Sequence, residues 1–102
     1  MSELHNGMRP IHPGEILREE FLGPLGMTPH ALSLALQIPA TRINDIVLER
    51  RGVTVDTALR LAKFFGTSAE FWLGLQTDFD LKTTQPAIAM ALVRIQPHAL
   101  AA

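Results

Sequence analysis

Residues 40 to 51 carry side chains whose types and spacing suit the edges of nucleic-acid bases. An asparagine amide can form two hydrogen bonds with adenine, and an arginine guanidinium can do the same with guanine. A threonine methyl group can contact the thymine methyl, and an aspartate can accept a hydrogen bond from the cytosine amine. The residues predicted to lie at such base edges are Thr41, Arg42, Asn44 and Asp45, and Ala40 just before them is also assigned to the DNA-binding surface.

A helix is needed to present these side chains on one side. At about 100° per residue, Ile43, Ile46 and Val47 share one face, so the polar residues of this segment point away from it. A second short helical pattern over residues 28–36 precedes this one, and only residues 37–39 separate the two. Two helices this short can cross steeply, which is the geometry of a helix-turn-helix. In that unit the second helix fits the major groove of DNA.

Phosphate contacts are predicted at two places beside this unit. Arg50 and Arg51 follow the second helix, where the chain leaves the groove near the DNA backbone. Thr28 is a good N-cap for the first helix, whose N-terminus can present free N–H groups to a phosphate. Asp45 repels phosphate, and it can either reach a cytosine or hold Arg42 in place. The alternative is that this polar face is the ordinary solvated surface of a small helical adaptor domain.

The composition is that of one folded domain. The chain has 102 residues, of which 47% are hydrophobic and 19% charged. The absence of cysteine excludes disulfides and thiolate chemistry. Nine Lys and Arg against ten Asp and Glu give a net charge of −1, whereas non-specific nucleic-acid binders are usually strongly basic. A sequence-specific binder that focuses a few cations on one surface is compatible with this balance.

The sequence offers no pattern for export, membrane insertion or catalysis. No basic segment followed by an apolar run opens the chain, and no apolar run approaches the ~18 residues needed to span a bilayer. The histidines lack the spacing of a zinc helix, and His12 with Glu15 would need further metal ligands. Glu15, Glu19 and Glu20 do not form a carboxylate pair suited to acid–base catalysis. We therefore expect a cytoplasmic protein with no membrane partner, cofactor, metal or enzymatic activity.

Apolar periodicity and capping residues predict five helices. The first begins at Pro13 and is stopped by Gly23-Pro24-Leu25-Gly26. The five are expected over residues 13–22, 28–36, 39–48, 54–65 and 68–82. The predicted fold is therefore an all-α domain over residues 12–82, preceded by a flexible arm over residues 1–11. Residues 83–102 are expected to form a C-terminal extension that either takes part in dimerisation or is partly disordered. The sequence allows either a sixth helix or a pairing strand in this extension.

Aromatic residues of the fifth predicted helix indicate a second contact surface. Phe71 and Leu75 are assigned to the core, whereas Trp72 or Phe79 is expected nearer a dimer seam. A domain of this size buries only ~60–65% of the surface that its unfolded chain exposes, so a partner subunit would add stability. The dimer contact is expected within residues 68–96, with an interface formed by Trp72, Leu75 and Phe79.

Four motifs follow one another in an order that resembles a known protein group. They are HPGEIL at 12–17, IPATRINDIV at 38–47, RGVTVDTALRL at 51–61 and FGTSAEFWLGLQ at 65–76. Over residues 9–82 the chain resembles the HigA-type (VapI-like) addiction-module antitoxins of the Xre/lambda-repressor helix-turn-helix group. The resemblance implies a five-helix, lambda-repressor-like domain.

The resemblance also implies partners and site residues. It implies a homodimer, commonly built through the fifth helix and the C-terminal region. It implies binding to double-stranded DNA at a palindromic operator in the chain's own promoter, and neutralisation of a HigB-type toxin, an mRNA-cleaving ribonuclease. By position, the implied recognition residues are Thr41, Arg42, Asn44 and Asp45, with Arg50 and Arg51 beside the DNA backbone. A protein-interaction module and a stand-alone transcriptional regulator without a toxin remain alternative functions.

Two positions depart from the pattern of that group. Leu48-Glu49 stands where Asn-Gly is common after the second helix of the unit, so a glycine stop is lost and an acid is placed near phosphate. Gln37 stands in the helix-turn-helix turn, where glycine is frequent. A left-handed conformation at Gln37 would cost roughly 1 kcal/mol relative to glycine.

Overall fold

All regular secondary structure in the described residues, 9–99, is helical in the computed structural model. The predicted all-α class is confirmed, and the alternative of a pairing strand after residue 83 is wrong because α7 is helical there. Of the arm predicted over residues 1–11, residues 1–8 lie outside the described part. The elements are α1 (Pro13–Ile16), η1 (Leu17–Leu22), α2 (Gly23–Leu25), α3 (Pro29–Leu36), α4 (Ala40–Val47), α5 (Val55–Phe65), α6 (Ala69–Ala87) and α7 (Ala89–Val93).

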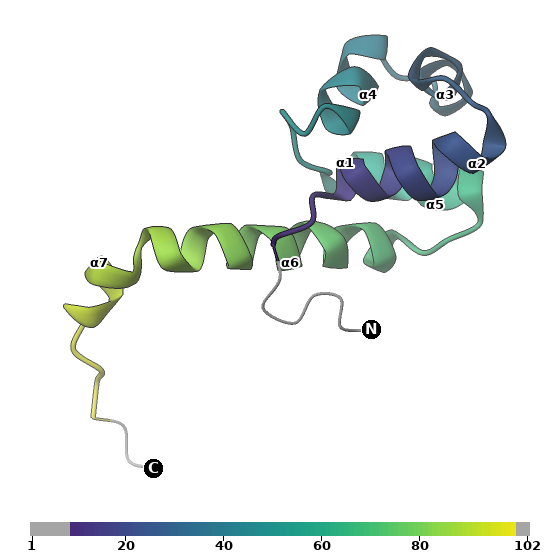
Figure 1. Ribbon diagram of the computed structural model, residues 1–102. Helices are drawn as coiled ribbons and strands as arrows, with labels where there is room; N and C mark the ends of the chain where they lie inside the picture. The colour runs from purple at the N-terminus through teal and green to yellow at the C-terminus, as the bar shows by residue number, and fades with distance from the viewer. Residues whose placement is uncertain (1–8, 100–102) are drawn as a thin grey trace.

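The first three elements form one continuous helix with a π-type turn in its middle (Figure 1). The Gly23 N–H bonds to the carbonyl of Arg18, five residues back, and the helix ends at Gly26 with a left-handed φ of 62°. The predicted stop at residue 22 is therefore too early. Proline crowds the carbonyl four residues before it, and the widened turn that precedes Pro24 makes room for its ring.

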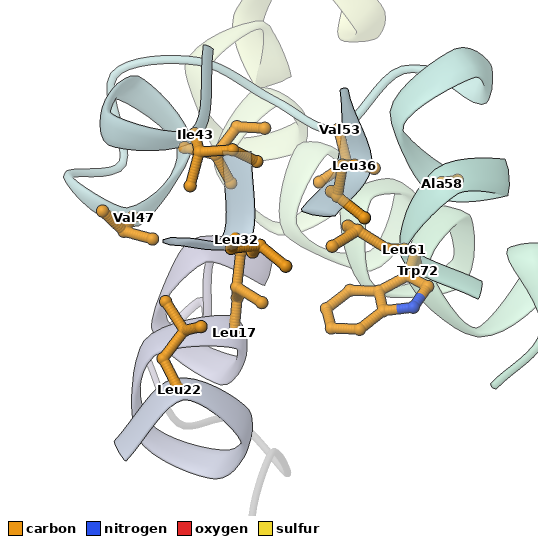
Figure 2. Packing of buried hydrophobic residues seen from close by; sticks show 11 residues of the cluster. Leu17, Leu22, Leu32, Leu36, Ile43, Val47, Val53, Ala58, Leu61 and Trp72 are labelled. Atoms are coloured by element: carbon orange, nitrogen blue, oxygen red, sulfur yellow. The ribbon is translucent and has the colours of Figure 1, made fainter. Parts of the chain in front are cut away.

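Helices from η1 to the first half of α6 enclose one hydrophobic core (Figure 2). Trp72 is its largest fully buried side chain, is 0% exposed, and donates its indole N–H to Thr67 Oγ1 at 2.7 Å. Its ring packs at 5.0 Å from that of Phe21. The other buried members are Leu17, Leu22, Leu32, Leu36, Ile43, Ile46, Val47, Val53, Ala58 and Leu61.

The burial of Trp72 corrects two sequence-based assignments on α6. Trp72 was predicted as a dimer-interface residue, and this is wrong because its whole side chain is covered within one chain. Phe71 was assigned to the core but is 40% exposed. Adjacent residues on a helix differ by about 100° in direction, so one aromatic faces the core while its neighbour turns away.

The α3–α4 unit is fixed to the rest of the body by close backbone contact. Gln37 joins the two helices with a left-handed φ of 59°, as its position in the turn predicts. At Gly14 in α1, an added Cβ would lie 1.8 Å from the carbonyl oxygen of Ile46 in α4. Only glycine allows the two helices to approach this closely.

Helix α6 is longer than predicted and extends beyond the other helices (Figure 1). Ser68 caps its start by accepting from the Phe71 N–H at 3.0 Å, but the helix continues past residue 82 and takes Pro86 into its last turn. Pro86 removes one helical hydrogen bond near an exposed end, where water can hydrate the freed carbonyl. The molecule measures 52 × 27 × 24 Å, and residues 81–99 form a projecting segment. Within residues 9–99, no helix has the length and apolar character to cross a membrane.

Candidate nucleic-acid interface

Helix α4 turns an apolar face inward and a polar face outward. Ile43 and Ile46 are 0% exposed, whereas Thr41, Asn44 and Leu48 are exposed. The predicted helical phase of this segment is confirmed. Ala40 begins the helix and is half-buried, as are Arg42 and Asp45 on its flanks. In Figure 1, α3 and α4 lie at one end of the molecule, on the other side of α1 and α5 from α6.

Arg42 is held by α5 rather than by its own helix. Its Nη1 lies 2.9 Å from Oδ1 of Asp56, and Nε of Arg60 lies 2.8 Å from the same oxygen. Arg60, followed by Arg42, holds the pKa of the Asp56 carboxyl below its ordinary value through hydrogen bonds. We call these three residues the Asp56 cluster. Of the two roles considered for Asp45, that of holding Arg42 is wrong, since Arg42 reaches across to Asp56 in the exposed first turn of α5.

Asp45 instead holds the two arginines that follow α4. Its Oδ1 lies 2.9 Å from Nη2 of Arg50, and its Oδ2 lies 3.7 Å from Nη2 of Arg51. The Arg50 N–H also bonds to the Asp45 carbonyl at 2.7 Å, which turns the chain back toward this side chain. These three residues form the Asp45 cluster. The predicted phosphate-contacting arginines thus lie together at the C-terminal end of α4, each paired with one carboxylate.

A further contact fixes the end of α4, and the sequence did not indicate its partner. Glu49 takes a left-handed φ of 62°, the conformation that glycine adopts easily. Its carboxylate lies 3.5 Å from Nη2 of Arg18, and Arg18 also donates from Nη1 to the Val47 carbonyl. Arg18 therefore binds a helix-end carbonyl and the acid beside it. The only signal in the sequence was an acidic residue, Glu49, at a position where glycine is common. No local pattern identified Arg18 as its partner.

Two helix starts on this side of the molecule have side-chain caps. Thr28 Oγ1 accepts from the Ala31 N–H at 3.0 Å, so the predicted cap of α3 is confirmed and its side chain already has a partner. Thr54 caps α5 in the same way, through the Thr57 N–H. A hollow of about 330 Å³ lies beside this second cap, and sequence reasoning did not anticipate it. Its lining residues are Arg42, Arg51, Gly52, Thr54, Asp56 and Thr57.

The groups considered for a metal have structural partners instead. His12 is 3% exposed, and its Nδ1 accepts from the Gly14 N–H at 2.8 Å, which caps α1. Burial lowers the pKa of His12. Its ring also packs edge-on against Phe79 at 4.8 Å. Glu15 receives two hydrogen bonds from Arg9, at 2.8 and 2.7 Å. Within residues 9–99, no three His, Cys, Asp or Glu side chains gather as a metal site.

Comparison with known proteins agrees with this geometry. The helix-turn-helix family matches residues 17–72, which include α3, the turn at Gln37 and α4. The chain belongs to the helix-turn-helix family. A curated relative is virulence-associated protein I of Dichelobacter nodosus, which is 56% identical over 80 residues that cover 78% of this chain and 74% of that protein.

Two solved structures extend the likeness within this family. Antitoxin HigA of Pseudomonas aeruginosa, solved with the higBA promoter, is 48% identical with a TM-score of 0.84 over 87% of this chain and 98% of that one. Antitoxin GraA in complex with its operator is 47% identical with a TM-score of 0.85 over 95% of this chain and 99% of that one. The resemblance to HigA-type and VapI-like antitoxins drawn from the sequence is confirmed.

Proposed function

We propose that this chain is an operator-binding antitoxin that represses its own toxin–antitoxin operon. The observation that carries this proposal is the outward face of α4, where Thr41 and Asn44 are exposed between paired arginines. Its relatives of known structure include antitoxins solved with a promoter or an operator. In this proposal α4 enters the major groove and reads base edges through Thr41, Arg42, Asn44 and Asp45.

Contacts to the DNA backbone position this helix. We assign them to Arg50, Arg51 and the N-terminus of α3 beside Thr28, because phosphate contacts fix register without carrying sequence information. Ala40 lies at the start of α4, where a small side chain allows the helix end to approach the DNA. The chain acts without catalysis and without a cofactor, in the cytoplasm, where promoter DNA and mRNA are both accessible.

The proposed active species is a homodimer. The projecting segment leaves many apolar side chains uncovered, and their exposed fractions reach 75% at Met90 and 80% at Val93. Large uncovered apolar surface usually marks an interaction site. Leu75 and Phe79 are half-buried on the same long helix and remain assigned to the interface beside this segment. A two-fold dimer matches a palindromic operator, since each subunit then places one α4 in one half-site.

The second proposed partner is a HigB-type mRNA-cleaving toxin. Support for it comes from the HigA-type and VapI-like relatives. A protein-interaction module that neutralises the toxin without binding DNA is the second candidate function. The pairing of each α4-face arginine with a carboxylate favours that candidate, because such pairing weakens attraction to phosphate.

The deciding experiment is a fluorescence-anisotropy titration of the full chain against its own upstream DNA and a scrambled duplex, over a salt series. We expect salt-dependent binding that prefers the upstream DNA. Asn44→Ala should lower that preference by roughly 10-fold or more, because one bidentate base contact contributes about 1–3 kcal/mol. Thr77→Ala, an exposed change on α6 outside the projecting segment, is the matched control. Equal binding to both duplexes would overturn operator recognition and leave toxin neutralisation as the function.

A further inference from the structure

Two carboxylates on the α4 side of the molecule are each shared by two arginines. In the Asp45 cluster, Arg50 and Arg51 converge on one side chain that is 29% exposed. Five donor atoms of arginine lie within 4.0 Å of carboxylate oxygens across the two clusters, at 2.8, 2.9, 2.9, 3.3 and 3.7 Å. Each cluster therefore carries one net positive charge rather than two.

The two clusters lie beside one hollow. Arg51 of the Asp45 cluster and Arg42 of the Asp56 cluster both line it, together with Asp56 itself. A DNA backbone that approaches this hollow meets arginines from both clusters and also meets a carboxylate. The electrostatic attraction of this face for phosphate is therefore only about half of what four unpaired arginines would supply.

We propose that Asp45 and Asp56 are specificity-determining residues that suppress binding to non-operator DNA. This inference rests on the proposed function as an operator-binding protein. Non-specific binding draws nearly all of its free energy from phosphate contacts, whereas operator binding adds contacts to base edges. A carboxylate that competes with phosphate for the same guanidinium weakens the phosphate contacts in both modes of binding. Non-specific binding therefore loses a larger fraction of its binding free energy than operator binding does.

The geometry of the guanidinium explains why operator binding is affected less. A guanidinium has five N–H donors, and Arg50 directs only Nε and Nη2 toward Asp45. Its remaining edge can bind a phosphate while the Asp45 contact stays intact. This arrangement requires a phosphate at one defined position, and we expect it to be there when the protein is bound in register with its operator. When the protein is bound elsewhere on DNA, the arginine must break its contact with Asp45 before it can reach a phosphate.

The test compares wild type with Asp45→Asn and Asp56→Asn in titrations against the upstream DNA and a scrambled duplex. Each change adds one positive charge to the face at nearly constant side-chain volume. For one added phosphate contact, we expect the slope of log K against log salt for the scrambled duplex to steepen by about 0.9. Between 50 and 200 mM salt this is about a 3- to 4-fold larger loss of affinity. We also expect the ratio of operator to scrambled affinity to fall at least 3-fold.

The matched control is Asp78→Asn, which makes the same charge change at an exposed carboxylate of α6 paired with Lys82. Asp78→Asn should leave the slope and the ratio unchanged. Asp45→Asn/Arg50→Ala restores the net charge and should return the scrambled affinity to the wild-type value. Thermal melts of each variant establish that the fold is retained.

The two hypotheses fail in different ways. A wild-type protein without preference for the upstream DNA would overturn the proposed function, while the scrambled-duplex titrations would still decide whether Asp45 and Asp56 suppress phosphate binding. A wild-type protein that prefers the upstream DNA, with Asp45→Asn and Asp56→Asn no different from Asp78→Asn on either duplex, would overturn this inference alone.

Discussion

The body of the protein (residues 12–80) and the projecting segment (residues 81–99) are both rich in apolar residues, but they use them differently. In the body, Leu17, Leu61 and Trp72 are 0% exposed. In the projecting segment, Met90 and Val93 are 75% and 80% exposed. Apolar content alone therefore does not decide whether a segment of this chain buries its side chains.

Spacing accounts for the difference. In α5, Ala58, Leu61 and Phe65 recur at three- and four-residue steps, so one stripe faces the core and the polar residues face water. Residues 87–93 are all apolar, so every side of α7 presents hydrocarbon and no single stripe can be buried against the body. The body buries its apolar side chains by its own packing, whereas we expect the projecting segment to bury them against a partner surface.

The largest expected effect tests the packing of the body. In Gly14→Ala the new methyl would lie 1.8 Å from a backbone oxygen of Ile46. Because the backbone cannot give way as a flexible side chain can, we expect a loss of about 3 kcal/mol in unfolding free energy, or roughly 15 °C in Tm. Gly74→Ala is the control, since nothing lies within 4 Å of the added Cβ. A Tm for Gly14→Ala equal to that of wild type would show that α1 and α4 are not held this closely.

The second prediction concerns the projecting segment. Met90→Asp/Val93→Asp puts two charges into the proposed dimer contact, and we expect the dimer Kd to rise at least about 100-fold, about 10-fold for each charge. Analytical ultracentrifugation measures this, and circular dichroism should show a body that remains helical. Thr41→Asp/Asn44→Asp adds the same charge to exposed polar positions of α4, outside the projecting segment, and should leave the Kd unchanged. A Kd that stays the same in both variants would place the dimer contact elsewhere.

A smaller effect is expected where η1 contacts the C-terminal end of α4. Arg18→Ala removes a hydrogen bond to the Val47 carbonyl and the ion pair with Glu49. We expect a loss of about 1 kcal/mol in unfolding free energy, together with faster amide exchange in the last turn of α4. Arg9→Ala breaks an exposed ion pair with Glu15 and should cost less. Equal losses in the two variants would argue against a helix-end role for Arg18.

The smallest effect is a dependence of stability on pH. Burial lowers the pKa of His12, so the unfolded chain binds a proton at a higher pH than the folded chain does. The contribution of neutral His12 is therefore fully present above about pH 6.5, the pKa of unfolded histidine, and is lost as pH falls through the folded pKa. Thermal melts from pH 7.5 to 5 should show a falling Tm. His12→Asn keeps a side-chain acceptor for the cap and should flatten that profile relative to wild type.

Local signals explain what the sequence predicted correctly. The caps at Thr28, Thr54 and Ser68 each accept from the N–H three residues later, as their residue types indicate. The inward and outward faces of α4 follow from the period of a helix alone. The motifs that carry the family resemblance lie in this same locally determined part of the chain.

The predictions failed where distant side chains decide the outcome. Arg42 pairs with Asp56, 14 residues away, and no local pattern separates that partner from Asp45. Phe71 and Trp72 are neighbours of similar type, and the ring of Phe21 and the hydroxyl of Thr67 determine which one is buried. The π-type turn before Pro24 and the length of α6 likewise depend on how the chain tolerates a proline within a helix.

The backbone contact at Gly14 separates two tasks that a recognition helix must perform. Helix α4 is held from inside, by its buried isoleucines and by the close approach of α1 to the carbonyl of Ile46. No outward side chain of α4 takes part in that contact. Thr41 and Asn44 can therefore be substituted without disturbing that contact. If α4 reads the operator as proposed, changes of operator preference can be engineered at these outward positions alone, with the interior of the protein left as it is.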